Sequence, residues 1–183
     1  MGKYIISVIG ESTVSPDSQK YILAEKLGEK LIDNNFRIQH GGRGGIMEAI
    51  SKGAKSSKNY QEGMLIGILP DFSRKLKNKY TDIVIPTGLD IMRNAIVVNA
   101  DAVIAIGGGA GTLSEMAMAW SMKRLLIAYD IDGWSGKLAG TKIDHRKRTS
   151  DPEDKVYKVS NEQEVLQILN KKLDFYTTSH SGI

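Results

Sequence analysis

Gly107–Glu115 (GGGAGTLSE) holds the residue types in this sequence best suited to chemistry. It follows an apolar run, Ala102–Ile106, and opens a segment of helical pattern that ends near Met122. A strand that enters a glycine-rich turn and then a helix presents backbone N–H groups to an anion. The helix N-terminus carries about half a positive charge, and glycine lets the anion approach the main chain. The spacing therefore predicts a site for a phosphate-bearing ligand.

A second loop repeats this pattern. Residues 41–48 (GGRGGIME) and 108–115 (GGAGTLSE) both read GGxGxxxE, and each lies between an expected strand and an expected helix. Two helix N-termini directed at one crevice suit a ligand with two anionic groups, or with a phosphate and a sugar. Tight turns alone would also explain the glycines of either loop. The predicted binding residues are Gly10 and Ser12 after the first strand, Gly41, Gly42, Arg43 and Gly44 in the first glycine loop, and Arg93, Gly108, Gly109, Gly111, Thr112 and Glu115.

Thr112 and Glu115 allow two interpretations. Thr-x-x-Glu at a helix start is the pattern of a capping box, in which both side chains bind backbone N–H groups. Alternatively, Glu115 faces the ligand and accepts hydrogen bonds or stabilises positive charge. Arg93 is the candidate cation for a phosphate because its guanidinium suits bidentate contact, and Arg43 lies within the first glycine loop. The alternative for Arg93 is an exposed helix residue, and the alternative for Arg43 is a surface loop residue.

Other candidate residues give weaker signals. His40 precedes the first glycine loop, where a hydrogen-bonded structural role competes with ligand contact. Trp134 lies in an Asp-Gly-Trp-Ser segment after a strand and either stacks on a base or packs a loop. The basic clusters at 74–79 and 142–148 are typical of solvated loops. No spacing among the three histidines and the carboxylates indicates a metal site.

The elements that position these residues alternate along the chain. Strands are expected at 4–9, 36–39, 64–69, 82–85, 102–106, 125–129 and 156–159. Helices are expected from Ser15-Pro16, as cap and first residue, to Asn34-Asn35, then over 46–55, 88–99, 110–122 and 162–173, the last capped by Asn161. This alternation predicts an α/β, Rossmann-like, doubly wound and mostly parallel sheet of six to seven strands. Ligands of such sheets bind at the carboxyl ends of the strands, where the glycine loops lie.

Length and composition set further limits. The 183 residues suit one nucleotide-binding domain over 1–174 with a polar tail over 175–183. The sequence has no cysteine, which fits a reducing cytoplasm and excludes disulfides and thiolate chemistry. The apolar run near the N-terminus is too short for a signal peptide or membrane span. A net charge of +4 suits an anionic small molecule and leaves nucleic acid an unfavoured partner.

Several common site motifs are missing from the sequence. The first turn, Gly10–Ser15, lacks the GxGxxG pattern of dinucleotide binding, and no Walker A lysine follows either glycine loop. No GxSxG elbow or Ser-His-Asp arrangement is visible.

The second glycine loop resembles the PGGxGTxxE motif of the LOG (LONELY GUY) proteins, long mislabelled as lysine decarboxylases. HGGRGGIMEAISKGA, GILP, PTGLDIMRNAIVVNADAVIAIGGGAGTLSE and DGW are similar to the branch that includes the molybdenum-cofactor carriers, over roughly residues 3–172. The resemblance implies a Rossmann-like homodimer or homotetramer that binds a nucleotide-type ligand. In LOG enzymes the matching arginine and glutamate, here Arg93 and Glu115, hydrolyse a nucleoside monophosphate to free base and ribose 5-phosphate. Two positions depart from the enzymes, because Gly107 replaces the motif proline and Asn94 replaces a lysine.

The leading hypothesis is a cytoplasmic binding or carrier protein for a phosphorylated nucleotide-like or pterin-like molecule. No cofactor is required, and the molybdenum cofactor or a nucleotide is the expected bound ligand. The alternative is a LOG-type phosphoribohydrolase with Glu115 and Arg93 as catalytic residues. A nucleotide sensor is a third interpretation. No lysine has the context of a cofactor site, which excludes lysine decarboxylase.

Overall fold

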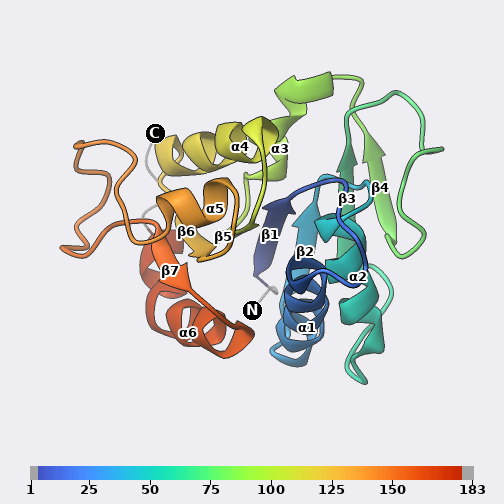
Figure 1. Ribbon diagram of the computed structural model, residues 1–183, viewed down its shortest axis with the longest axis horizontal. Coiled ribbons are helices and arrows are strands. Elements are labelled where there is room, and N and C mark those ends of the chain that lie inside the picture. The colour runs from blue at the N-terminus through green and yellow to red at the C-terminus, as the bar shows by residue number, and fades with distance from the viewer. Residues whose placement is uncertain (1–3, 179–183) are drawn as a thin grey trace.

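The computed structural model describes residues 4–178 and contains a single seven-stranded parallel sheet (Figure 1). The strands are β1 (Ile5–Gly10), β2 (Arg37–His40), β3 (Leu65–Leu69), β4 (Ile83–Pro86), β5 (Ala102–Ile106), β6 (Leu125–Tyr129) and β7 (Tyr157–Val159). The helices are α1 (Gln19–Asp33), α2 (Ile46–Ser56), α3 (Asn94–Val97), α4 (Ala110–Ser121), α5 (Trp134–Leu138) and α6 (Glu162–Thr178), with a 3-10 helix η1 (Asp90–Arg93).

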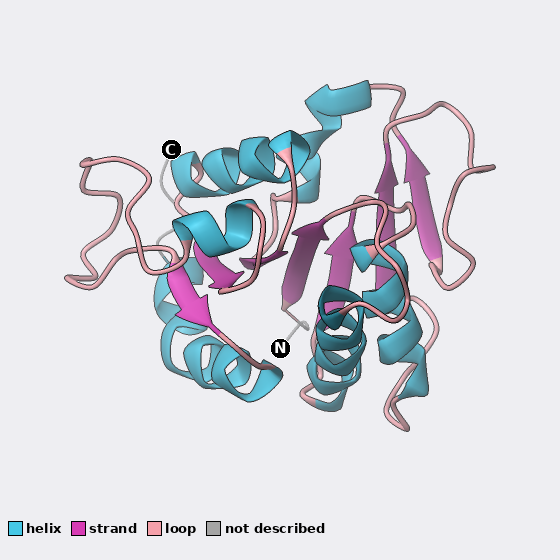
Figure 2. Cartoon of the chain, viewed as in Figure 1, coloured by secondary structure: helices cyan, strands magenta, loops and turns pink. Residues whose placement is uncertain are grey.

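The strand order is β4-β3-β2-β1-β5-β6-β7. The chain therefore winds outward from β1 in one direction, returns to the centre at β5 and winds outward in the other. Helices cover both faces of the sheet (Figure 2). This confirms the doubly wound α/β prediction. The order reverses between β1 and β5, which is the switch point at which such sheets bind ligands.

Two apolar cores form on opposite faces of the sheet, and β5 shows how one strand supplies both. Its Ala102, Ile104 and Ile106 pack in the core beneath α1, α2 and α6, whereas Val103 and Ala105 face the core beneath α3, α4 and α5. Alternate side chains of a strand point to opposite faces. A strand buried on both faces therefore reads as a continuous apolar run, which is why the central strands were predictable.

Helix α1 begins three residues later than predicted. Ser15 was the expected cap, but the N-cap is Ser18, whose hydroxyl accepts a hydrogen bond from the Tyr21 N–H. Ser15 instead accepts a hydrogen bond from Ser18 through its carbonyl oxygen, at 2.7 Å. The predicted end of the helix at Asn34-Asn35 is confirmed, because Asn34 is the C-cap.

The segment expected to form one helix over 88–99 is shorter and mixed. It begins with the 3-10 turn η1 and continues as α3, and Asp90 has a positive φ of 48°. The apolar residues of its helical pattern do not face the sheet. Leu89, Met92 and Ile96 are 47%, 69% and 42% exposed. The helical spacing of these apolar residues therefore marks the solvent-facing side of the segment.

The C-terminal helix is longer than predicted. Asn161 caps α6 as expected, since its Oδ1 accepts a hydrogen bond from the Glu164 N–H at 3.0 Å. The helix continues past Leu173 into the segment expected as a tail, and Tyr176 is fully buried. The remaining tail, 179–183, lies outside the described residues. No helix within residues 4–178 combines the length and apolarity needed to cross a membrane.

Candidate functional site

A cleft of about 520 Å³ opens at the carboxyl ends of β1, β2 and β5. Its walls come from the turn after β1, the first glycine loop, the η1–α3 segment and the first turns of α4. The lining residues are Ile9, Gly10, Glu11, Ser12, Thr13, Gly41, Arg43, Met47, Pro70, Asp90, Ile91, Arg93, Asn94, Gly109, Gly111, Thr112 and Glu115. The structure therefore brings most of the predicted residues together. Gly42, Gly44 and Gly108 belong to the loops but do not line the cleft.

The second glycine loop requires glycine at its first two positions. Gly107 and Gly108 have positive φ values of 63° and 98°. Proline has a fixed φ near −65° and no N–H. The Gly107 N–H donates to Ser135 Oγ at 2.7 Å, so both its φ and its hydrogen bond exclude the proline of the LOG motif. The replacement of the motif proline by Gly107 is therefore a requirement of this turn.

Helix α4 directs its free N-terminal N–H groups at the cleft. Its N-cap is Gly109, and no side chain caps it. A Cβ added at Gly109 or Gly111 would meet no atom within 4 Å, so the space beside this first turn is open. Unpaired N–H groups and the positive end of the helix dipole together form a seat for an anion.

The capping-box interpretation of Thr112 and Glu115 is wrong. Because α4 begins at Ala110, Thr112 lies inside its first turn and cannot serve as the N-cap. Glu115 lies almost one turn further along, with its Oε1 3.6 Å from Arg93 Nη1. Its carboxylate is therefore not committed to the helix backbone and faces the cleft.

Glu115 has an unusual protonation equilibrium. Burial raises its pKa to about 7, against the opposing effect of the Arg93 charge and hydrogen bond. The carboxyl group is 10% exposed, so water solvates its charge poorly. At neutral pH this group can therefore give or accept a proton inside the cleft.

Arg93 is largely buried, and one of its N–H donors is unpaired within residues 4–178. Its side chain is 13% exposed, and Nη1 donates to Asn94 Oδ1 at 3.3 Å. Its Nε is fully buried and has no hydrogen-bond partner among the described residues. Burial lowers the pKa of Arg93, and the Glu115 charge opposes this. A buried guanidinium with an unsatisfied N–H favours an anionic ligand, because an unpaired buried donor is costly.

Gly41 makes room for this guanidinium. A Cβ at Gly41 would lie 3.0 Å from Arg93 Nη2 and 2.9 Å from Met47 Sδ. The first glycine loop and Arg93 are therefore in direct contact across the cleft. Arg43, by contrast, is paired with Asp71, whose carboxylate oxygens lie 3.0 and 2.8 Å from its Nη2. Its charge is partly neutralised before any ligand arrives.

His40 has a structural role in the described contacts. Its Nδ1 accepts a hydrogen bond from the Gly42 N–H at 3.0 Å, and its Nε2 lies 2.8 Å from Ser51 Oγ. Ser51 in turn donates to the Met47 carbonyl, so Nε2 of the histidine donates to Ser51. Burial lowers the pKa of His40 to about 4, with the Arg93 charge adding to the effect. A neutral His40 thus supports the first glycine loop from behind.

Glu11 and Lys20 complete the site and were missed as site residues. The Glu11 carbonyl accepts from the Ile46 N–H at 2.9 Å, at the start of α2. Its Oε1 accepts from the Gly108 N–H at 3.0 Å and pairs with Lys20. Burial would raise the pKa of Glu11, but the Lys20 and Gly108 hydrogen bonds outweigh it and lower that pKa. The only sequence signal was an acidic residue directly after a buried strand.

Trp134 packs rather than lining the cleft. The N–H groups of Trp134 and Ser135 donate to the carbonyls of Gly108 and Gly107, at 2.9 and 3.0 Å. The indole packs against the core beneath α4 and α5, and Lys137 lies over its ring. The Asp-Gly-Trp-Ser segment therefore holds the second glycine loop in place. No cluster of metal-ligating side chains occurs within residues 4–178.

The fold and cleft define a class of protein: a Rossmann-like α/β domain with a cleft at its switch point. The chain belongs to the SLOG cluster4 family, whose model matches residues 3–166, within the LOG-like superfamily that the sequence resembles. A protein of Archaeoglobus fulgidus is 41% identical over 115 residues, which cover 62% of this chain and 72% of that protein.

Two solved structures share the fold over nearly their whole length. The molybdenum cofactor binding protein of Rippkaea orientalis is 31% identical, with a TM-score of 0.76, covering 93% of this chain and 98% of the other. The molybdenum cofactor carrier protein of Chlamydomonas reinhardtii is 26% identical, with a TM-score of 0.73, covering 94% and 99%.

Proposed function

We propose that the protein binds and carries a phosphorylated, pterin-like or nucleotide-like small molecule, with the molybdenum cofactor as its ligand. The observation that carries this proposal is the largely buried Arg93, which lines a cleft bordered by the open N-terminus of α4 and has an Nε without a hydrogen-bond partner among the described residues. Both features favour a phosphate group. The two similar cofactor-binding structures support the choice of cofactor.

The cleft also suits the rest of such a ligand. Its volume of about 520 Å³ falls in the range of small-molecule sites, roughly 300–1,000 Å³. Its apolar wall consists of Ile9, Met47, Pro70 and Ile91. A flat ring can lie against this wall while the phosphate contacts Arg93 and α4. The chain's residues would thus bind and orient the ligand and keep it from bulk water.

Residue Gly109 offers a direct test. Gly109→Val places a branched side chain into open space beside the N-terminus of α4, at an extended backbone position with a negative φ. Ala110→Val is the matched control, because Ala110 is the exposed neighbour that does not line the cleft. Each purified protein is denatured, and the released small molecules are identified by mass spectrometry. We expect a phosphorylated pterin or nucleotide from wild type and Ala110→Val, and none from Gly109→Val.

The hydrolase alternative rests on Glu115, a cleft carboxyl with a pKa of about 7 beside Arg93. It is tested by incubating the protein with AMP and measuring free adenine and ribose 5-phosphate. Turnover that disappears in Glu115→Gln would replace the carrier proposal with the enzyme. Retained ligand without turnover would exclude the hydrolase.

The carrier also assembles with itself in this proposal. The η1–α3 face, formed by Leu89, Met92 and Ile96, exposes large apolar side chains next to the cleft. Exposed apolar patches of this kind are typical of protein interfaces. A second copy of the chain is the occupant that the family resemblance indicates. The cytoplasmic location expected from the sequence stays a prediction.

A further inference from the structure

We propose a second anion site, for a tetrahedral oxyanion of the phosphate type, in a small pocket at the C-terminal end of α4. The pocket measures about 110 Å³, and its lining residues are Trp120, Ser121, Lys123, Arg146, Lys147 and Arg148. A water molecule occupies about 30 Å³ of liquid, so the pocket can hold one small oxyanion. This site is independent of the cleft and of the function proposed for it.

The net positive charge of the pocket favours an anion. Four of the six lining side chains are cationic. Asp144 neutralises Arg146 and Asp154 neutralises Arg148. Lys123 and Lys147 have no acidic partner within residues 4–178, which leaves a net charge of about +2. This charge outweighs the half negative charge that a helix C-terminus contributes.

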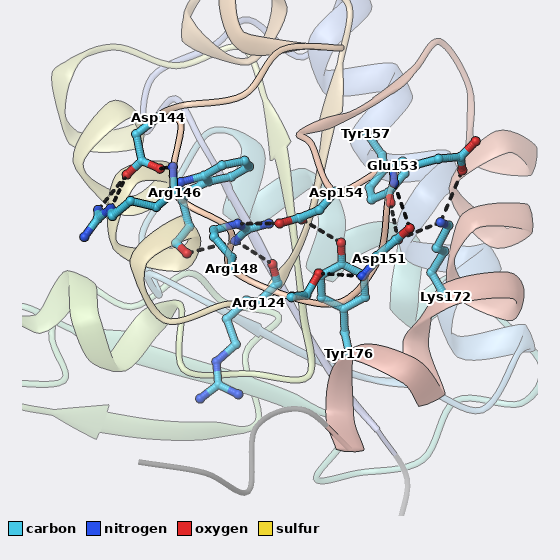
Figure 3. Close-up of polar contacts among 12 residues, drawn as sticks. Arg124, Asp144, Arg146, Arg148, Asp151, Glu153, Asp154, Tyr157, Lys172 and Tyr176 are labelled. Carbon is cyan, nitrogen blue, oxygen red and sulfur yellow. Dashed lines mark hydrogen bonds and ion pairs between the residues drawn. The ribbon is translucent and has the colours of Figure 1, made fainter.

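One of the four cations, Arg148, is held in place by the contacts shown in Figure 3. Arg148 is buried, pairs with Asp154 and donates to the Trp120 carbonyl at 2.8 Å, with its Cζ 3.5 Å from the centre of the Trp120 ring. Asp154 also accepts from Tyr176 at 2.7 Å, which joins this segment to α6. The loop over 142–148 is thus fixed at one end against two helices. Because Arg148 is already ordered, its guanidinium can contact an anion without a further loss of side-chain entropy.

The backbone conformation of Lys123 is a second observation that supports the site. It has a positive φ of 58°, at the residue after the C-cap of α4. The hydrogen bonds from the N–H of Lys123 to the Trp120 carbonyl and from the N–H of Arg124 to the Ala119 carbonyl, both 3.0 Å, form a Schellman motif. Glycine strongly prefers this position, and asparagine is the usual substitute.

Helix α1 ends with the same motif but obeys that preference. There the left-handed position is Asn35, with φ 65°. A long lysine at the equivalent position of α4 is unfavourable for the backbone, yet it places an ammonium group at the pocket. Strain at a specific residue is a reason to look for a function. The pocket lies at the far end of α4 from the cleft, because a helix of 12 residues is about 18 Å long.

The two tryptophans of the sequence give separate readouts. Trp120 lines the pocket, and Trp134 packs behind the second glycine loop. We would record the indole N–H resonances of ¹⁵N-labelled protein during titration with orthophosphate, with AMP and with chloride at matched ionic strength. Trp134→Phe assigns the signals. We expect a saturable shift of the Trp120 signal with phosphate and none with chloride.

Variants connect this response to the pocket. Lys123→Gly and Lys147→Ala should weaken the response at least tenfold, whereas Lys142→Ala, an exposed lysine of the same loop outside the pocket, should leave it unchanged. A response to orthophosphate assigns the free anion, and one to AMP alone assigns a phosphate monoester; either supports the site.

Stability separates a binding role from a structural one. Lys123→Gly removes the backbone strain, so it should raise the melting temperature by about 2–4 °C while the phosphate response is lost. The proposal is overturned if the Trp120 signal does not shift saturably with either phosphate probe. It also fails if chloride shifts the signal equally, or if Lys123→Gly and Lys147→Ala respond like wild type.

Discussion

Glu115 is the residue whose state most affects the chemistry of the cleft. Its carboxyl is buried and touches Arg93, and it is free of the helix cap that the sequence allowed it to form. Whether it carries a charge sets the charge balance around any bound phosphate. A proton on Glu115 favours an anionic ligand, because it removes a nearby negative charge.

The raised pKa of Glu115 predicts a pH-dependent stability. Folding raises this pKa from an ordinary value near 4.5 to about 7, so the folded state binds the proton more tightly between these pH values. The free energy of unfolding should therefore fall as the pH rises through this window, by on the order of 3 kcal/mol. Glu115→Gln, which mimics the protonated form, should lose this dependence. Urea unfolding at pH 5 and pH 8 measures it, and equal slopes in both proteins would contradict the assignment.

Some of the site could be predicted from single residues and some could not. The position of the glycine loops was predictable because each directly follows a buried strand and precedes a helix, so both lie at the carboxyl edge of the sheet. Arg93 and Glu115 were found by motif, but their contact joins η1 to α4 and has no local signal. Glu11 was missed for the same reason, since its partner Gly108 lies 97 residues away. A local pattern also misled at the start of α1, where Ser15 was the expected cap and Ser18 is the N-cap.

At the scale of elements, the segment between α5 and β7 is fixed by buried ion pairs and aromatic contacts. Arg148 and Asp154 have side chains only 4% and 9% exposed, and they join this segment to α4 and α6. The same segment contains a second ion pair, Arg146–Asp144, in which the Arg146 side chain is 76% exposed. The two pairs should therefore contribute very differently to stability.

Arg148→Met should destabilise the fold by roughly 3–5 kcal/mol, because it leaves the Asp154 carboxylate buried without its cation. Arg148→Met combined with Asp154→Leu should recover much of this loss. Arg146→Met serves as the control and should have no measurable effect in urea unfolding. If Arg148→Met and Arg146→Met unfold at the same urea concentration, the segment is not held by the buried pair.

The helical pattern over 88–99 shows why periodicity alone does not locate a core. It correctly predicted helical backbone, but its apolar side faces outward at Leu89, Met92 and Ile96. A pattern reports which face avoids water and does not say what covers it. The structure leaves Leu89, Met92 and Ile96 exposed to solvent.

For the whole molecule, this outward face predicts self-association. Met92→Glu places a charge in the centre of the η1–α3 face and should convert the assembly to single chains, as measured by size-exclusion chromatography with light scattering. Ile22 is an exposed apolar residue on a different element, α1, so Ile22→Glu is the control and should leave the mass of the assembly in solution unchanged. A wild-type protein that runs as a single chain at all concentrations would refute the proposed assembly.

The strand order has a consequence for how the protein is made. β1 pairs with β2, the next strand along the chain, but its other neighbour is β5, and Ile6 lies opposite Ala102. The cleft spans this late pairing, because Gly10 and Ser12 form one wall and α4 the other. At translation speeds of about 5–20 residues per second, the first half of the sheet waits several seconds for the second. We therefore expect the cleft to form only after α4 has left the ribosome.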